Sequence, residues 1–284
     1  MQLPNVTIKQ LLEAGVHLGH KTLRWNPKME KFIFGKKNSI HIIDLVQTID
    51  LLKVALTEIH KCISSGGKIL FVSTKKQASE TVTNLAKDTS QSYVSYRWLG
   101  GMLTNWKTIS NSIKRYKNLS EDLKKENKGF TKKEVLKLGV ERDKLERSLG
   151  GIADMEKLPS MIFIIDTNTE SLAVNEAIKL SIPIVAIVDT NSNPTNISYP
   201  IPGNDDARRS ISLYCDLIKQ TILDAQKHIS TQEKKVDEEA IVEKKIIKSE
   251  NKKESTNKKM SFKTEKKTKS IFSKIKKLAS KKLI

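Results

Sequence analysis

The sequence has only two cysteines, few aromatic residues and no long apolar run. Cys62 and Cys215 lie far apart without a Cys-x-x-Cys pair, so no disulfide framework or cysteine-based zinc site is available, and both are expected to be buried. No stretch approaches the ~20 apolar residues of a membrane-spanning helix, and residues 1–10 lack the features of a signal peptide. We therefore expect a cytoplasmic protein that has no membrane partner.

The motifs that bind nucleotide phosphates are missing as well. No Gly-x-x-x-x-Gly-Lys-Ser/Thr stretch exists, and the apolar run at 69–72 is followed by a Ser-Thr-Lys-Lys-Gln segment without glycines. There is no Gly-x-Ser-x-Gly elbow either. We predict that the protein is not an enzyme and needs no cofactor. A nucleotide-binding enzyme remains the alternative, because the fold predicted below often carries one.

What the chain has in excess is lysine. It carries 51 Lys+Arg against 32 Asp+Glu, a formal net charge of +19, of which residues 1–228 contribute +9 and residues 229–284 contribute +10. Such a surplus indicates a polyanionic partner. Only seven of the 51 are arginines. A lysine-rich surface favours diffuse attraction to phosphates over bidentate recognition of individual groups.

Three short apolar runs predict strands that are buried on both faces: Ile69–Val72, Met161–Ile165 and Ile184–Val188. Helical patterns alternate with them, at residues 8–16, 44–64, 74–88, 169–180 and 205–226. Alternating strands and helices indicate an α/β fold, a Rossmann-like (flavodoxin-like) parallel sheet between helices. A small hairpin is expected near the start of the chain, with its turn at 35–38.

A different period between the strands predicts an insertion. Mainly apolar residues step by three and four over 109–123 and, with Arg142 among them, again over 138–152, and Thr131 with Glu134 has the spacing of a capping box. We interpret 107–156 as an antiparallel coiled-coil hairpin inserted into a core of 1–106 and 157–228. Two further core helices are the alternative.

The last segment, 229–284, is rich in Lys, Glu, Ser, Thr and Asn and is predicted to be a disordered tail. Within it, Ile271, Ile275 and Leu278 have helical spacing, so 270–284 is a candidate amphipathic helix that folds on an RNA groove or, less favoured, a membrane surface.

Two loops combine cations with aromatic rings, at 19–28 and 96–107. Such loops offer cations to phosphates and a flat ring to a base. The candidate RNA contacts there are Lys21, Arg24, Trp25, Lys28, Arg97 and Lys107. Interior anchoring is the favoured alternative for Trp25, Trp98 and Trp106. Lys75 and Lys76, at a predicted helix start, are further candidates for a phosphate contact.

A metal site is left open. His17 and His20 have a spacing that suits one metal ion if the segment is helical, and Asp189 and Asp205 follow from the ends of predicted elements. The alternative is that these histidines are packing residues at a helix end.

Five segments in one order closely resemble bacterial-type small-subunit ribosomal protein two: Ala14–Met29, Ile40–Asp44, Leu70–Ala78, Arg97–Asn105 and Ile201–Ser210. The resemblance implies a non-enzymatic structural constituent of the small ribosomal subunit that binds its ribosomal RNA between head and body and supports translation. It adds Lys36 and Lys37 to the RNA-binding candidates. The implied partners are that RNA, neighbouring small-subunit proteins and the large multi-repeat ribosomal protein that captures messenger RNA. An RNA-independent adaptor acting through the helical hairpin is a further alternative.

Removing residues 229–284 is predicted to leave the fold intact and to weaken RNA association, mainly at higher salt, because this segment carries +10 of the net charge. Salt titration of RNA binding by the full chain and by a chain ending at His228 checks this. An unchanged salt dependence would show that these lysines make no contribution.

Overall fold

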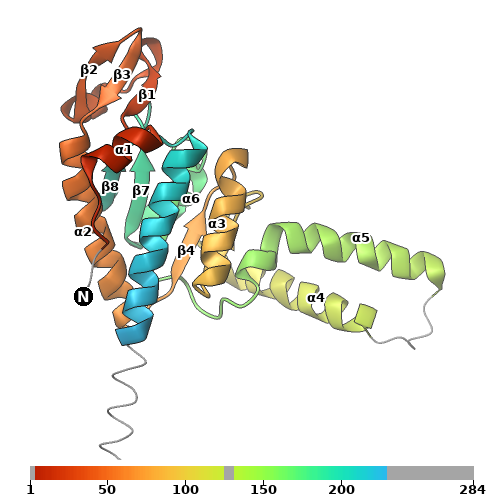
Figure 1. The fold of residues 1–284 in the computed structure, drawn as a ribbon. Helices are drawn as coiled ribbons and strands as arrows, with labels where there is room; N and C mark the ends of the chain where they lie inside the picture. The colour runs from red at the N-terminus through yellow and green to blue at the C-terminus, as the bar shows by residue number, and fades with distance from the viewer. Residues whose placement is uncertain (1–3, 125–130, 229–284) are drawn as a thin grey trace, which may run out of the picture. The chain divides into compact units, whose positions relative to one another are not determined.

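The computed structural model describes residues 4–124 and 131–228 (Figure 1). These residues belong to one unit, Met1–Ile229. The predictions of a disordered tail at 229–284 and an amphipathic helix at 270–284 lie outside the described residues. In the part of the chain that is described, no helix has the length and apolar character needed to cross a membrane.

A five-stranded sheet, parallel throughout, forms the centre of this unit. Its strands lie in the order β5-β4-β6-β7-β8. Their bounds are β4 Ile69–Val72, β5 Ser92–Val94, β6 Met161–Ile165, β7 Ile184–Val188 and β8 Tyr199–Pro202. The three predicted strands are confirmed as β4, β6 and β7. The sequence did not predict β5, which has three residues, or β8, which contains two prolines that only an edge strand tolerates.

Alternate residues of each central strand face opposite layers of helices. Ile69 and Phe71 pack with α2 (Leu45–Ser64), α3 (Lys76–Asp88) and the helix over 208–228. Leu70 and Val72 pack on the other face with α6 (Ser171–Lys179) and the first turns of α4. Figure 1 shows the sheet between these helices. The predicted Rossmann-like α/β sandwich is confirmed.

The helix ends follow from local chemistry. α1 covers Ile8–Ala14 and ends at Gly15, whose φ of 78° is the left-handed conformation that glycine adopts without strain. The Asp44 carboxylate accepts a hydrogen bond from the Val46 amide and caps α2. Of the two cysteines, Cys215 is buried as expected, whereas Cys62 is only half-buried.

Two helices lie between β5 and β6: α4 (Trp106–Lys124) and α5 (Lys132–Leu149), followed by the 3-10 turn η3 (Gly150–Ile152). They pack against each other. The predicted capping box is present, since the Thr131 side chain accepts from the Glu134 amide and the Glu134 side chain accepts from the Thr131 amide. The residues predicted to face the partner helix are all buried or half-buried: Ile109, Ile113, Tyr116, Leu119, Leu123, Leu138, Arg142, Leu145, Leu149 and Ile152.

A second, antiparallel sheet has the order β1-β3-β2, with β1 Leu18–Lys21, β2 Ile33–Lys37 and β3 Ile40–Ile43. Asn38 and Ser39 both have positive φ, 51° and 62°, as in the tight turns that suit the twist of a hairpin. The turn therefore lies at 38–39, and the prediction of a turn at 35–38 is wrong. Lys36 and Lys37 belong to strand β2.

The carboxylate of Glu176 on α6 holds the loop between β5 and α4. It accepts hydrogen bonds from the Trp98 indole at 3.0 Å and from the amides of Gly101 and Leu103 at 2.8 and 2.9 Å. The amide and hydroxyl of Thr104 donate to it as well, both at 3.1 Å. Burial acts to raise the pKa of Glu176, but these five donors outweigh it and lower that pKa.

Substitution of Glu176→Gln is predicted to lower the free energy of unfolding by about 2 to 3 kcal/mol, because an amide places N–H groups against buried donors. Urea unfolding checks this. Glu80→Gln, an exposed position on α3, is the matched control, and its effect should stay within about 0.5 kcal/mol. Equal effects of the two substitutions would contradict the assigned role.

Candidate nucleic-acid interface

The segment after β1 is fixed to the body of the protein and exposes several cations to solvent. The 3-10 turn η1 (Thr22–Arg24) and the 3-10 helix η2 (Pro27–Phe32) follow directly, and Met29 and Phe32 of η2 are buried. The backbone amide of Asn26 donates to the Thr190 carbonyl at 2.8 Å, which ties the segment to the end of β7. Four candidates predicted from sequence are exposed on this fixed segment: Lys21, Arg24, Trp25 and Lys28.

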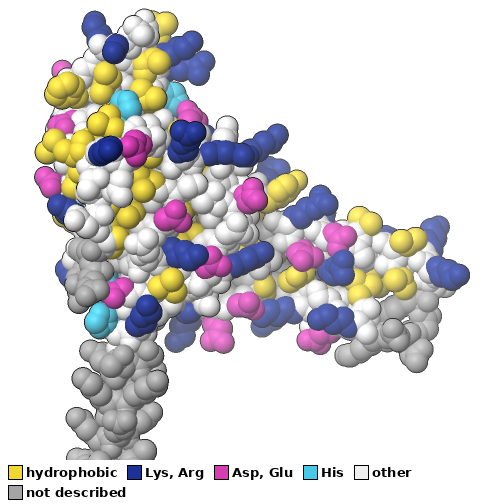
Figure 2. All heavy atoms as spheres, viewed as in Figure 1, with side chains coloured by type: hydrophobic (Ala, Val, Ile, Leu, Met, Phe, Trp, Pro, Cys, Tyr) yellow, Lys and Arg dark blue, Asp and Glu magenta, His cyan; other side chains and the backbone are white. Residues whose placement is uncertain are grey.

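The β2–β3 hairpin adds two cations beside this segment. Lys36 pairs with His41 and Lys37 with Ile40 across the two strands, and both lysines are exposed. In Figure 2, Lys and Arg side chains gather over the three-stranded sheet at the top of the view. The two loops and the hairpin thus leave long cationic side chains free to reach phosphates.

The loop held by Glu176 carries Arg97 and Lys107, both of them exposed. Trp98 is buried, at 6% exposure, and Trp106 is half-buried. The favoured reading of these two rings as interior anchors is confirmed. Trp25 differs, because 36% of it is exposed while its ring lies 5.4 Å from that of His41. It is the tryptophan that can reach a base from this surface.

Eight of the predicted cations have no carboxylate within 4.0 Å among residues 4–124 and 131–228: Lys21, Arg24, Lys28, Lys36, Lys37, Lys76, Arg97 and Lys107. Other surface cations are neutralised locally, such as Lys61 by Glu58 and Lys219 by Asp88, both at 2.6 Å. The eight candidates therefore keep their charge available for a polyanion.

Arg208 and Arg209 were not among the candidates predicted from sequence. Both are exposed, and neither has an ion pair with an acid within the described part of the chain. Just before them, the Asn204 side chain accepts hydrogen bonds from the amides of Asp206 and Ala207 at 2.9 and 3.1 Å. The two arginines join the unpaired cations.

Lys75 differs from these exposed cations. Its ammonium lies 2.6 Å from Asp206, 2.9 Å from Asp205 and 3.2 Å from Asp166, and only 15% of its side chain is exposed. Burial opposes this charge, but the surrounding carboxylates outweigh it and raise the pKa of Lys75. Burial and the neighbouring carboxylates raise the pKa of Asp205 to about 7, against the pull of the ammonium. The ammonium of Lys75 is therefore engaged by carboxylates of the protein itself, and this disfavours Lys75 as an RNA contact.

The predicted phosphate site at the start of α3 is taken by another carboxylate. Both the amide and the hydroxyl of Thr74 donate to Glu170 at 2.6 Å. Burial raises the pKa of Glu170, although the bonds from Thr74 oppose the shift. An incoming phosphate would meet this acid where it needs free donors, which disfavours a phosphate at the Thr74 amide but leaves the exposed Lys76 side chain available.

The hypothesis that His17 and His20 share one metal ion, which the sequence left open, is not supported, because His17 is not part of the group of candidate ligands around His20. The helix ends before them, and His20 lies on β1. The donor atoms of His20, Asp189, Asp205 and Asp206 do lie within 4.8 Å of one another, a set that could hold a divalent cation. The His20 ring is 2.7 Å from Asp189, whose bond outweighs burial and raises the pKa of His20. Lys75 already supplies a positive charge to two of these acids.

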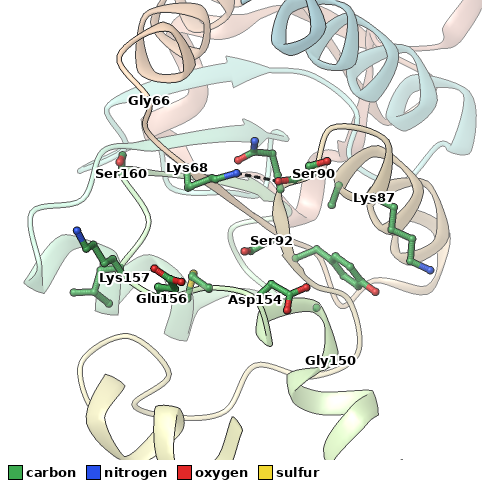
Figure 3. Close-up of a pocket in the computed structure, with 16 residues that line it drawn as sticks. Gly66, Lys68, Lys87, Ser90, Ser92, Gly150, Asp154, Glu156, Lys157 and Ser160 are labelled. Atoms are coloured by element: carbon green, nitrogen blue, oxygen red, sulfur yellow. Dashed lines mark hydrogen bonds between the residues drawn. The ribbon is translucent and has the colours of Figure 1, made fainter. Parts of the chain in front are cut away.

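A cavity of about 770 Å³ opens at the amino ends of β4, β5 and β6 (Figure 3). Lys68 reaches across it to the Ser90 carbonyl at 3.3 Å. Asp154 and Glu156 lie on the same wall as Lys157. Ligands of parallel α/β sheets bind at the opposite, carboxyl ends of the strands, and a lining of mixed charge does not favour a polyanion. We assign no part of the interface to this cavity.

Substitution of Lys75→Met is predicted to lower the free energy of unfolding by about 3 kcal/mol, because it leaves buried carboxylates without their cation. The neighbouring Lys76→Met is the control and should change stability by less than about 0.5 kcal/mol. Urea unfolding at neutral pH measures both. If Lys75→Met were as mild as Lys76→Met, the internal role of Lys75 would be refuted.

Comparison with known proteins gives a consistent result. The profile of the family described as Ribosomal protein S2 matches residues 11–225. Small ribosomal subunit protein uS2 of Parvibaculum lavamentivorans is 60% identical over 224 residues, covering 79% of this chain and 88% of the relative. The proteins of the same name from Sinorhizobium medicae and Bartonella quintana are each 58% identical over 224 residues; the alignment covers 79% of this chain with both, and 88% and 87% of the respective relatives. These relatives are named as ribosomal proteins and not as enzymes. The chain belongs to the ribosomal protein S2 family, the cytoplasmic uS2 proteins of the small ribosomal subunit.

Proposed function

We propose that this protein binds small-subunit ribosomal RNA through unpaired cations of the two loops, of the β2–β3 hairpin and of the first turns of α3 and of the helix over 208–228. The proposed contacts are Lys21, Arg24, Trp25, Lys28, Lys36, Lys37, Lys76, Arg97, Lys107, Arg208 and Arg209. The observation that carries this proposal is the absence of a neutralising carboxylate within 4.0 Å of these cations in the described residues, although other surface cations, such as Lys61, Arg115 and Lys219, are paired with acids.

The binding mechanism follows from the chemistry of these groups. Each unpaired lysine or arginine that meets a phosphate releases condensed counterions, so affinity depends steeply on salt. The anchored loops set where the charges lie, and Trp25 offers an exposed ring for stacking on a base or sugar. Binding needs no turnover and no cofactor.

The position between head and body of the subunit is supported by the family resemblance. Protein neighbours are supported by the surface itself, because Leu23 and Phe34 are 96% and 79% exposed beside the unpaired cations. Apolar side chains of this kind suit a protein better than a phosphate. The large messenger-capturing ribosomal protein stays within the proposal as one such neighbour.

The nucleotide-binding enzyme is the weaker candidate. Its ligand would bind where the strand order reverses, between the carboxyl ends of β4 and β6. There Lys75 meets Asp166, and Glu170 takes the donors of Thr74. Protein carboxylates occupy the place of the nucleotide phosphates.

The double substitution Arg24→Gln/Lys28→Gln is predicted to weaken binding to purified small-subunit ribosomal RNA. The slope of log affinity against log salt should become shallower by roughly 0.7 to 0.9 for each phosphate contact removed. Filter binding of the full chain over a range of salt concentrations measures both quantities.

The matched control is Lys61→Gln/Lys219→Gln, which removes the same formal charge from residues already paired with Glu58 and Asp88. It should leave the salt slope near that of the unaltered chain. If the control weakened binding as much as the loop substitutions, attraction would be diffuse and the named interface would be refuted. Crosslinking on assembled subunits then tests the position between head and body.

A further inference from the structure

A second group of metal-binding side chains lies outside the interface. His60 is on α2, in the last turns before β4, and Asp224 and His228 are one turn apart on the helix over 208–228. The Nε2 atom of His60 is 3.4 Å from Asp224 Oδ2, and the Nε2 atom of His228 is 3.5 Å from the same oxygen. Donor atoms of all three residues lie within 4.8 Å of one another.

These separations match the edges of a metal coordination shell. With zinc–ligand bonds of about 2.0 to 2.1 Å, two ligands of a tetrahedral site lie roughly 3.3 to 3.4 Å apart. A good hydrogen bond between imidazole and carboxylate would be shorter, about 2.7 to 2.9 Å. The centroids of the two rings lie 5.7 Å apart and their planes are inclined at 66°, so the rings meet edge to face and are not stacked.

His60 supplies independent support for a bound ion. The residue is only 8% exposed, and its Nε2 atom is buried without a hydrogen-bond partner. Its other ring nitrogen, Nδ1, lies 3.2 Å from the Ser64 hydroxyl. If Nδ1–H donates to Ser64, the lone pair of Nε2 faces Asp224 and His228. Histidine ligands of metals are commonly oriented in this way by a hydrogen bond from the second nitrogen.

We propose that His60, Asp224 and His228 bind one divalent transition-metal ion, with zinc as the best match, and that a water completes the shell. Two imidazoles and one carboxylate suit zinc, whereas calcium and magnesium prefer oxygen ligands alone. The side chain of His228 is 51% exposed, which leaves solvent access for the fourth ligand. The ion fastens the end of α2 to the last described turn of the chain's body.

This site is separate from the acidic group at His20. Residue 60 lies before the amino end of β4, whereas Asp189 and Asp205 follow the carboxyl ends of β7 and β8. The sequence after His228 contains no histidine or cysteine, so it offers no competing imidazole or thiolate ligand.

Zinc binding by the purified, chelator-treated full chain tests the proposal. Equilibrium dialysis counts the ions bound per chain, and substitution by cobalt reports tetrahedral geometry from its visible absorption. His228→Gln should lose one bound ion and the cobalt absorption of this site. His60→Gln should do the same. Ser64→Ala should keep the site but weaken it by about 10-fold, since it removes only the orienting hydrogen bond.

His20→Gln is the control, because it removes a donor from the other group and should leave the His60 site unchanged. His228 is half-exposed, so its substitution is not expected to impair folding, and it decides the test even if His60→Gln unfolds the chain. A His228→Gln chain that binds as many zinc ions as the unaltered chain would overturn the proposal.

Discussion

The burial of the central strands on both faces is the constraint from which the rest of the structure follows. Every residue of β4, β6 and β7 is buried, and alternate side chains fill two separate cores. Backbone polar groups in such a sheet must pair with neighbouring strands. Charged groups are therefore kept out of these central strands, and the functional candidates lie in loops, at helix starts and on the exposed strand β2.

The cations fall into two groups for this reason. Lys75 follows β4 directly and lies where the carboxyl ends of β6 and β8 bring Asp166 and Asp205 together, so its charge stabilises the core. The loop lysines and arginines lie farther from these acids and remain unpaired. Two residues adjacent in sequence, Lys75 and Lys76, thus have opposite surroundings: the first is largely buried and paired with carboxylates, and the second is exposed. Because both residues are lysines, this difference is caused by their positions relative to the carboxyl ends of the strands.

The sequence predicted what depends on local pattern. The strands β4, β6 and β7, the helix starts and the capping box at Thr131 follow from periodicity and from residues a few positions apart. The short strand β5 and the proline-containing β8 lack such a pattern and form by pairing with their neighbours. For the site, exposed loop cations were predicted correctly as exposed, but the partners of Lys75 were not. Asp205 lies 130 positions from Lys75, and Glu176 lies 78 positions from Trp98. Only the assembled sheet brings them together.

The same contacts explain how a fold typical of nucleotide-binding proteins serves here as a scaffold. In such sheets the ligand lies at the reversal of strand order, where free amides and helix starts face a phosphate. Here that point lies between β4 and β6, and it is closed by the Lys75–Asp166 ion pair and by the bonds from Thr74 to Glu170. A nucleotide would have to break a buried ion pair and place phosphates against carboxylates. An RNA that binds the outer loops would neither break a buried ion pair nor place phosphates against carboxylates, because the cations there are unpaired and already exposed to solvent. At the strand ends, the carboxylates of the core neutralise Lys75, the cation that could otherwise have bound a nucleotide phosphate. The unpaired cations lie on the surface instead, where they are available to a larger polyanion.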